Sequence, residues 1–266
     1  MPKTPISATI ITYNEEDRIA GAIASLSCCD DVLVVDSEST DRTREIAERC
    51  GARVILRKWD GYSRQKNFAA TEAAYDWILS IDADERVSAE LSNDIVAWKA
   101  MDRGPNGPAA FSMPRRVFYF GAWIGHSGWY PDRKVRLYDR RRGQWSGDFV
   151  HEALEVNGGI SRFSGDLLHF PYRSWDEQMQ RANRYTQLAA GAAKQSGQAG
   201  SPLRLLCGPP VSFIQTFILR GGFLDGWRGA AIAYAGARYV FIRELRILRI
   251  SLLDKGEVRG GSIDSR

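Results

Sequence analysis

Residues 77–85 read Trp-Ile-Leu-Ser-Ile-Asp-Ala-Asp-Glu, and this stretch decides both the fold and the first functional hypothesis. Its apolar, β-prone first half predicts a buried strand that ends in two carboxylates, Asp82 and Asp84. Alternate residues of an extended segment share one face, so both carboxylates can point to a single cation. Their oxygens suit Mg²⁺ or Mn²⁺, which proteins usually bind together with substrate phosphates. Two acids at a strand end more often form a solvated turn, so the motif needs support from the rest of the chain.

Upstream of this stretch, strands alternate with helices. Three apolar runs predict strands at residues 6–12, 32–35 and 52–56. A helix at about Asp17–Leu26 fits after the first strand, and a second helix, capped by Ser39 or Thr40, runs to about Cys50. Strands that alternate with helices of this length indicate βαβ units and an α/β fold with a largely parallel sheet.

Polar side chains gather where these strands end. Parallel α/β sheets bind ligands beyond the carboxyl ends of their strands. The polar residues that fall at those ends are Tyr13, Asn14, Asp36, Asp82 and Asp84. We therefore expect them to converge on one crevice.

Composition fits a cytoplasmic enzyme of one compact domain with an appendage. The 266 residues, 44% of them hydrophobic, are enough for one large α/β core. The four cysteines show no C-x-x-C spacing, which favours a reducing compartment and excludes a zinc finger. The N-terminus carries no apolar signal stretch, so we expect no export. The best candidate boundary, Gln195 to Pro202, predicts a catalytic domain over residues 1–196 and an extension over 197–266.

Three motifs occur in a characteristic order: Thr12-Tyr13-Asn14-Glu15, then Val35-Asp36-Ser37-x-Ser39-x-Asp41, then Asp82-Ala83-Asp84. In this order the chain resembles the GT-A glycosyltransferases of family 2 over essentially its whole length. The resemblance is closest to the branch of the lipopolysaccharide core β-1,4-glucosyltransferases. It implies a GT-A fold, an inverting transfer, a nucleoside diphosphate sugar as donor, with UDP-glucose the first guess, and a divalent metal, Mg²⁺ or Mn²⁺.

The resemblance also implies roles for the motif residues. Asp36 would hold the uracil or ribose, and Asp84 would hold the metal on the diphosphate. Tyr13 and Glu15 would line the nucleotide pocket. The remaining donor-binding positions implied by the motifs are Thr12, Asn14, Ser39 and Asp82.

Cations and rings elsewhere extend the candidate site. Residues 61–68 predict a helix start that brings Arg64 or Lys66 to the diphosphate, or else an exposed helix with solvated cations, and the family comparison favours Lys66. Residues 118–123 and 128–131 place aromatic rings beside glycines, a combination that suits stacking on a sugar as well as ordinary packing. The strand predicted after them carries Arg133, and less clearly Arg136, toward the diphosphate or an anionic acceptor.

An inverting transfer needs a general base within hydrogen-bond reach of the acceptor hydroxyl. Family 2 enzymes place this acid about sixty to seventy residues after the Asp-x-Asp, a window that contains Asp148 and Glu152. We favour Glu152, because Phe149 and Val150 set it at the edge of an apolar patch. The neighbouring His151 is either a contact to metal or phosphate or a packed side chain.

The positive charge of the chain is concentrated near its C-terminus. From Leu203 to Ile250 there are seven arginines and two acids, a balance of +5 against +4 for the whole chain. Residues 227–248 carry an apolar helical stripe, which together with the charge predicts a helix lying on an anionic membrane surface. A helix packed on the catalytic core is the alternative. No apolar run reaches the length of about 18 residues expected of a spanning helix, and Pro209-Pro210 interrupts the best candidate.

Several classes of function remain open at this point. We favour a peripheral enzyme of the cytoplasmic leaflet that glycosylates a glycolipid such as the lipopolysaccharide core, or alternatively a polyprenyl-linked oligosaccharide. A non-catalytic protein that binds nucleotides or nucleic acid would interleave basic and aromatic residues along one face. Here the acids cluster at strand ends instead, so we expect no nucleic acid partner. A nucleotidyltransferase would show a glycine-rich basic loop after the first strand, and residues 12–18 have none.

Overall fold

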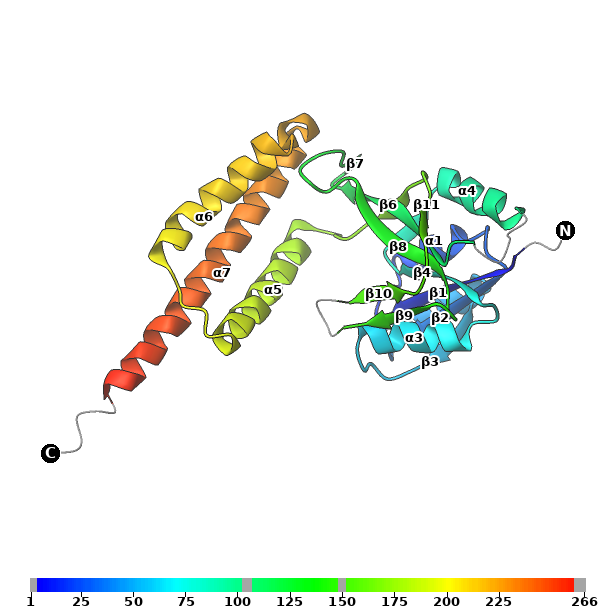
Figure 1. Ribbon diagram of the computed structural model, residues 1–266, viewed down its shortest axis with the longest axis horizontal. Helices are drawn as coiled ribbons and strands as arrows, with labels where there is room; N and C mark the ends of the chain where they lie inside the picture. Colours follow the sequence, from blue (N-terminus) through cyan, green and yellow to red (C-terminus); the bar gives the residue numbers. More distant parts are fainter. Residues whose placement is uncertain (1–3, 102–106, 148–151, 261–266) are drawn as a thin grey trace. The chain divides into compact units, whose positions relative to one another are not determined.

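The computed structural model describes residues 4–101, 107–147 and 152–260, with side chains described as far as residue 252. The chain divides into two compact units. The α/β unit comprises residues 1–118 and 131–170, and the helical unit comprises residues 119–130 and 171–266. Figure 1 labels their elements along the chain.

The α/β unit is built on a mixed sheet. Its strands run in the order β3-β2-β1-β4-β8-β6-β12-β5, and β9 and β10 form a separate antiparallel pair. The strands are β1 (Ile6–Thr12), β2 (Asp31–Asp36), β3 (Arg53–Leu56), β4 (Trp77–Asp82), β5 (Glu85–Val87), β6 (Ala110–Tyr119), β8 (Asp132–Asp139), β9 (Gly143–Ser146), β10 (Ala153–Val156), β11 (Ile160–Arg162) and β12 (Leu167–His169). The expected α/β fold is confirmed.

The parallel half of this sheet brings the sequence motifs together. Strand β1 lies between β2 and β4 and is parallel to both. Thr12 stands opposite Asp36 on one side, and Ile11 stands opposite Asp82 on the other. Three motifs that lie far apart in the sequence therefore meet at one edge of the sheet.

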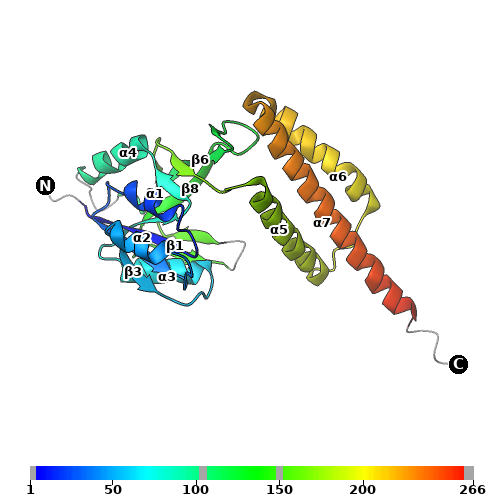
Figure 2. The ribbon, with the colours of Figure 1, turned by 180° about the vertical axis from the view of Figure 1, so that it is seen from behind.

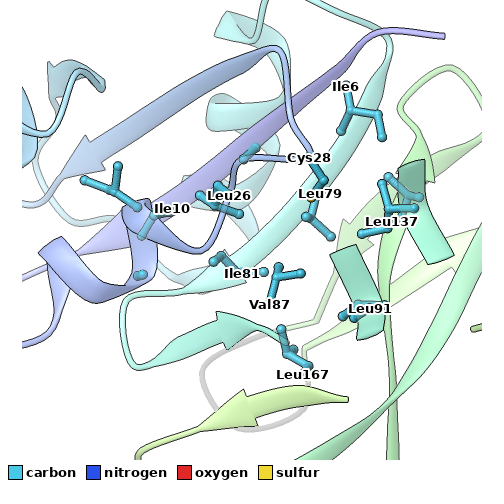
Figure 3. Packing of buried hydrophobic residues seen from close by; sticks show 14 of the residues in the cluster. Ile6, Ile10, Leu26, Cys28, Leu79, Ile81, Val87, Leu91, Leu137 and Leu167 are labelled. Atoms are coloured by element: carbon cyan, nitrogen blue, oxygen red, sulfur yellow. The ribbon is translucent and has the colours of Figure 1, made fainter. Parts of the chain in front are cut away.

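Side chains of alternating residues cover the two faces of the sheet. One face packs Ile10, Val34 and Leu79 into the main hydrophobic cluster, part of which Figure 3 shows. The other face buries Leu33 and Val35 with residues of the third helix. Helices α1 (Ile19–Ala24), α2 (Thr43–Arg49) and α4 (Ala89–Lys99) contribute to the first cluster, and α3 (Tyr62–Glu72) covers the opposite face. This two-faced burial explains why the strands read as continuous apolar runs.

One predicted helix cap is wrong. Helix α2 begins at Thr43 and its N-cap is Arg42, which makes no capping hydrogen bond through its side chain. Of the two residues expected as the cap, Ser39 instead donates its hydroxyl to the buried carboxylate of Asp36, and Thr40 donates its hydroxyl to Asn14 Oδ1. The carboxylate of Asp36 is a strong acceptor, so the Ser39 hydroxyl binds it instead of capping the helix. The helix therefore begins only at Thr43.

The helical unit contains α5 (Trp175–Gln195), α6 (Pro202–Ile214) and α7 (Trp227–Gly260), together with the short strand β7 (Ala122–Trp123). Figures 1 and 2, from opposite sides, both show α6 and α7 side by side. Ala190 and Ala193 of α5 pack against Ile247 of α7. By compactness α5 therefore belongs with the C-terminal helices, whereas the boundary proposed from the sequence assigns it to the catalytic domain. The functional boundary at residue 196 stays a prediction.

The two prolines do not interrupt the helix that contains them. Pro209 and Pro210 lie inside α6, which a π-helical turn, Gln215–Leu219, continues. The segment Pro202–Leu219 is 18 residues long, has a mean hydropathy of 1.2 and is not buried anywhere. Among the described residues, this segment is long and apolar enough to cross a membrane, judged by its length and composition only. The expectation that no such apolar run exists is therefore wrong. An exposed helix tolerates these prolines because solvent can reach the carbonyls that lose their N–H partners.

Much of the apolar surface of the helical unit is exposed. Helix α6 has no buried residue. The predicted stripe on α7 is helical, but Trp227, Tyr234 and Phe241 on it are 61%, 56% and 45% exposed. The face of α7 that does pack contains Ile232, Ala233 and Ile247 instead.

Candidate functional site

The loops after β1 and β2 are tied together through Asp36. This carboxylate is completely buried, and Ser39 donates to both of its oxygens, from the backbone N–H at 2.8 Å and from the hydroxyl at 2.5 Å. The Ser39 hydroxyl in turn accepts the backbone N–H of Asn14 at 2.9 Å. Asn14 has a φ of 54°, a left-handed conformation that asparagine tolerates better than most residues. Two of the sequence motifs thus form one hydrogen-bonded loop pair.

The residues around Asn14 present different surfaces. Thr12 is buried, and its hydroxyl has no hydrogen-bond partner among the described residues. The side chain of Tyr13 is 57% exposed, so its ring can reach a ligand. Glu15 is paired with Arg18 at 3.2 Å. The site at this edge therefore combines one open ring with polar groups whose positions are already fixed.

A cluster of charges lies beside these loops, at the end of β4. Lys66 of α3 is almost completely buried, and its Nζ lies 3.2 Å from Asp82 Oδ1 and 2.8 Å from Glu152 Oε1. The same ammonium lies 4.5 Å from the centre of the Trp145 ring. Arg136 of β8 donates to the other oxygen of Asp82 at 2.6 Å. Asp82 is therefore held between two cations.

The cluster fixes the charge state of Asp82. Burial alone would raise the pKa of this carboxyl, but the positive charges of Arg136 and Lys66 outweigh it and hold the pKa well below its ordinary value. Burial acts in the opposite sense on Arg136, whose pKa is nevertheless raised by Asp82 and Glu85. Both groups are ionised at neutral pH, so a second anion entering the site meets cations that are already partly neutralised.

Glu85 is a further, fully buried member of the charge cluster. Its side chain is fully buried and accepts from Arg136 at 2.8 Å and from Arg115 at 3.3 Å. Its other oxygen accepts the backbone N–H of Asp82 at 3.1 Å. Glu85 therefore fixes the turn that connects β4 to β5 and carries Asp84.

Asp84 has a different environment from Asp82. Its Oδ2 lies 3.4 Å from Nε2 of His169 on β12. The other nitrogen of His169, Nδ1, is buried without a hydrogen-bond partner among the described residues. No group of three metal-ligating side chains occurs in the described part of the chain. Asp84 and His169 supply one oxygen and one nitrogen, a set that fits a divalent ion only if other ligands, such as phosphate oxygens, complete the sphere.

Glu152 has one engaged and one unengaged oxygen. Lys66 binds Oε1, and Oε2 is buried with no hydrogen-bond partner among the described residues. A carboxylate anchored in this way can accept a proton on its second oxygen. Asp148 and His151 lie outside the described residues.

Several sequence-based assignments can be compared with these positions. Arg136, rather than Arg133, lies in the charge cluster, because Arg133 donates to the backbone carbonyls of Ser112 and Phe163. The donor role of Arg133 stays a prediction. Glu85 and His169 received no role from the sequence. Glu85 could have been found from the sequence, because it directly follows the Asp-x-Asp motif. Nothing in the sequence links His169 to Asp84.

Comparisons with known proteins place the chain among glycosyltransferases. Residues 7–154 match the model of the family described as glycosyl transferase family 2. The chain is 30% identical over 264 residues to the lipopolysaccharide core biosynthesis glycosyltransferase LpsC of Rhizobium meliloti, with 93% of each chain covered. It is 32% identical over 257 residues to an uncharacterized glycosyltransferase of Rickettsia typhi, with 92% of this chain and 88% of the relative covered.

A solved structure shows a weaker likeness. The mannosyltransferase PcManGT of Pyrobaculum calidifontis, determined with GDP-mannose and Mn²⁺, is 16% identical. The alignment covers 98% of this chain and 81% of that one, with a TM-score of 0.47.

Proposed function

Because the chain belongs to glycosyl transferase family 2, we propose that it is an inverting, metal-dependent transferase that moves glucose from UDP-glucose to a lipid-linked glycan. A glycan of the lipopolysaccharide core type is the first candidate acceptor, since the LpsC relative is named for that pathway and is matched along nearly its whole length. A polyprenyl-linked oligosaccharide is the alternative acceptor.

The paired loops after β1 and β2 form the nucleoside side of this site. Asp36 and Ser39 hold the loop in shape through their mutual hydrogen bonds, and the exposed Tyr13 ring offers a stacking surface for the base. Thr12, Asn14 and Glu15 complete the donor contacts. Lys66 and Asp82 lie next to these loops, where the ammonium stabilises negative charge that develops on the leaving diphosphate.

Asp84 and His169 would hold the metal. Their side chains meet at 3.4 Å, and both can turn toward a shared ion whose remaining ligands come from the diphosphate. A bound Mg²⁺ or Mn²⁺ supplies charge stabilisation for the leaving diphosphate. The protein orients the donor through the fixed turn that Glu85 holds.

Glu152 carries the proposal for catalysis. Its Oε2 is the one carboxylate oxygen of the charge cluster that is buried without a partner among the described residues, and Lys66 holds the group in place through Oε1 at 2.8 Å. We assign it the proton of the acceptor hydroxyl, with Asp148 as the second candidate. Abstraction of that proton generates the nucleophile that attacks the anomeric carbon from the side opposite the diphosphate, which inverts the configuration.

Two isosteric variants test this assignment. We expect Glu152→Gln to lose turnover by a factor of about one hundred or more while donor affinity is retained, because the base is lost and the donor contacts remain. Purified protein is assayed against a panel of nucleotide sugars with a core-type acceptor, and UDP affinity is measured by calorimetry. Asp148→Asn is the matched variant. If it shows this pattern while Glu152→Gln stays active, Asp148 is the base.

The metal assignment has its own test. Asp84→Ala should abolish transfer and the metal-dependent part of UDP binding while the thermal unfolding transition stays in place. Full activity of this variant, or of the unaltered enzyme in excess chelator, contradicts the proposal.

The helical unit supports a position on the membrane. Its exposed apolar side chains on α6 and α7 and its excess of arginines suit the cytoplasmic leaflet, where a lipid-linked acceptor is found. The enzyme would then meet its acceptor in two dimensions rather than in solution.

A further inference from the structure

The helical unit contains a cavity of its own. It has a volume of about 250 Å³ and is lined by residues of α5, α7, the π-helical turn and the loop that holds Ser127 and Trp129. An apolar cavity of about 150 Å³ admits benzene, so this volume can hold one substituted six-membered ring.

The walls of this cavity combine rings with cations. Trp129, Tyr172, Tyr185 and Tyr239 line it, as do Arg181 and Arg220, and no acidic side chain does so among the described residues. Aromatic faces and tyrosine hydroxyls suit the apolar and hydroxyl-bearing sides of a sugar. The arginines add an excess of positive charge that a neutral sugar does not require.

The two arginines differ in how far they are already neutralised. Arg181 is paired with Glu177 at 3.4 Å and lies 5.4 Å from the centre of the Tyr172 ring. No hydrogen bond or ion pair engages the Arg220 guanidinium within the part of the chain that the structure describes. The stem and the guanidinium both pack closely on Gly128: a Cβ there would lie 2.7 Å from Arg220 Cδ and 2.9 Å from Arg220 Nη1. Arg220 is thus positioned by packing and keeps its charge for a ligand.

Hydrogen bonds hold two other parts of the lining in place. Asp225 accepts the backbone N–H groups of Gly125 and His126 at 3.0 and 3.1 Å and the Ser127 hydroxyl at 3.1 Å. This carboxylate fixes the loop that carries Trp129. Elsewhere in the lining, the buried side chain of Gln178 accepts from the Tyr119 hydroxyl at 2.7 Å, so its amide N–H groups are the donors that it can offer to the cavity.

We propose that this cavity binds one anionic sugar residue of the acceptor, with the sugar ring against the aromatic wall and its phosphate or carboxylate on Arg220. The inference rests on the proposed function for the identity of the acceptor, and it adds a substrate class, an acidic or phosphorylated glycan. A site of this kind would select acceptors by charge.

Ligand-observed saturation-transfer NMR on the full-length protein tests the proposal, with glucose 6-phosphate and glucuronate as probes. At least one of them should bind saturably, and which one does so identifies phosphate or carboxylate as the anion. Neutral glucose and inorganic phosphate should each bind about tenfold more weakly, because each lacks half of the recognition. Saturating UDP should not displace the anionic sugar.

Variants complete the test. Arg220→Gln should weaken binding of the anionic sugar about tenfold, Arg220→Lys should restore part of it, and the exposed Arg249→Gln on α7 should leave it unchanged. Absence of saturable binding, inorganic phosphate binding as tightly as glucose 6-phosphate, or an unchanged affinity in a folded Arg220→Gln protein overturns the proposal. UDP affinity, measured on the same samples, reports separately on the proposed function: its loss without loss of sugar binding would count against the donor site alone.

Discussion

The two units of this protein treat their charged and apolar groups in opposite ways. In the α/β unit, Lys66, Glu85 and Arg136 are buried, and each is engaged by a partner of opposite charge. In the helical unit, large apolar side chains are exposed, α6 buries none of its residues, and Arg220 has no ionic partner among the described residues. In the α/β unit, the buried charges are compensated by other groups of the same chain. The helical unit leaves apolar surface and charge available for something outside the chain.

The largest effect should come from breaking the charge cluster. Arg136→Ala removes a buried cation that Asp82 and Glu85 share, and it leaves each carboxylate with one remaining cation, Lys66 for Asp82 and Arg115 for Glu85. We expect the free energy of unfolding to fall by about 3–5 kcal/mol, measured by urea denaturation. Arg249→Ala, an exposed arginine of the helical unit, should change it by less than about 0.5 kcal/mol. Similar losses in both variants would remove the contrast between the units.

Acid should weaken the α/β unit for the same reason. The pKa values of Asp31, Asp41, Asp82, Asp132 and Asp139 are lowered, because hydrogen bonds and nearby cations outweigh burial. A lowered pKa in the folded state adds stability that is complete above the unfolded value of about 4 and is lost as the pH falls below it. We expect a loss on the order of 3 kcal/mol between pH 7 and pH 3, measured by urea titrations at both pH values.

The Arg136→Ala protein provides the control for this prediction. It lacks a main cause of the lowered pKa of Asp82, so its stability should fall less between the same two pH values. An equal or greater fall would show that the cluster does not set the acid sensitivity.

Exposed apolar side chains of the helical unit should matter for vesicle binding and not for folding. Phe241→Ser should weaken binding to anionic liposomes by about 2 kcal/mol in a flotation assay, because one large apolar contact with the bilayer is lost. Val96→Ser is matched in exposure, 48% against 45%, but lies on α4 of the α/β unit and should have no effect. If neither substitution changes liposome binding, or if that binding does not weaken with added salt, the apolar face of α7 has no membrane role.

A smaller effect is expected at Asp36, where the polar network is local. Asp36→Asn keeps the shape of the side chain but weakens its hydrogen bonds with Ser39, which hold the loop of the proposed nucleoside pocket. We expect UDP affinity to fall about tenfold by calorimetry, close to 1.4 kcal/mol, with a smaller loss of stability. An unchanged affinity would move the nucleoside pocket away from this loop.

The sequence predicts the parallel half of the sheet well, for a physical reason. Strands buried on both faces appear as uninterrupted apolar runs, and their carboxyl ends must lie at one edge, so the meeting of Thr12, Asp36 and Asp82 follows from local pattern alone.

The sequence does not predict which charged side chains pair with one another, because the partners lie far apart along the chain. The sequence suggests that Asp82 and Asp84 point to one cation, yet Asp82 lies between Lys66 and Arg136 and Asp84 lies beside His169. No spacing rule connects residues on different strands whose order in the sheet is unknown. The prediction that Pro209 and Pro210 interrupt the helix was wrong for another reason. It assumes that the carbonyls that lose their N–H partners stay without a hydrogen bond, whereas on an exposed helix solvent can bind them.

The charge cluster also bears on how quickly the chain can fold. Lys66 and Glu152 lie 86 positions apart, and Asp82 and Arg136 lie 54 positions apart. Closing such long loops is entropically costly, and until both loops close, each buried charge lacks the partner that compensates its dehydration. We therefore expect the cluster to form late in folding and to penalise collapsed chains with a wrong strand order, in which these charges would be buried without their partners.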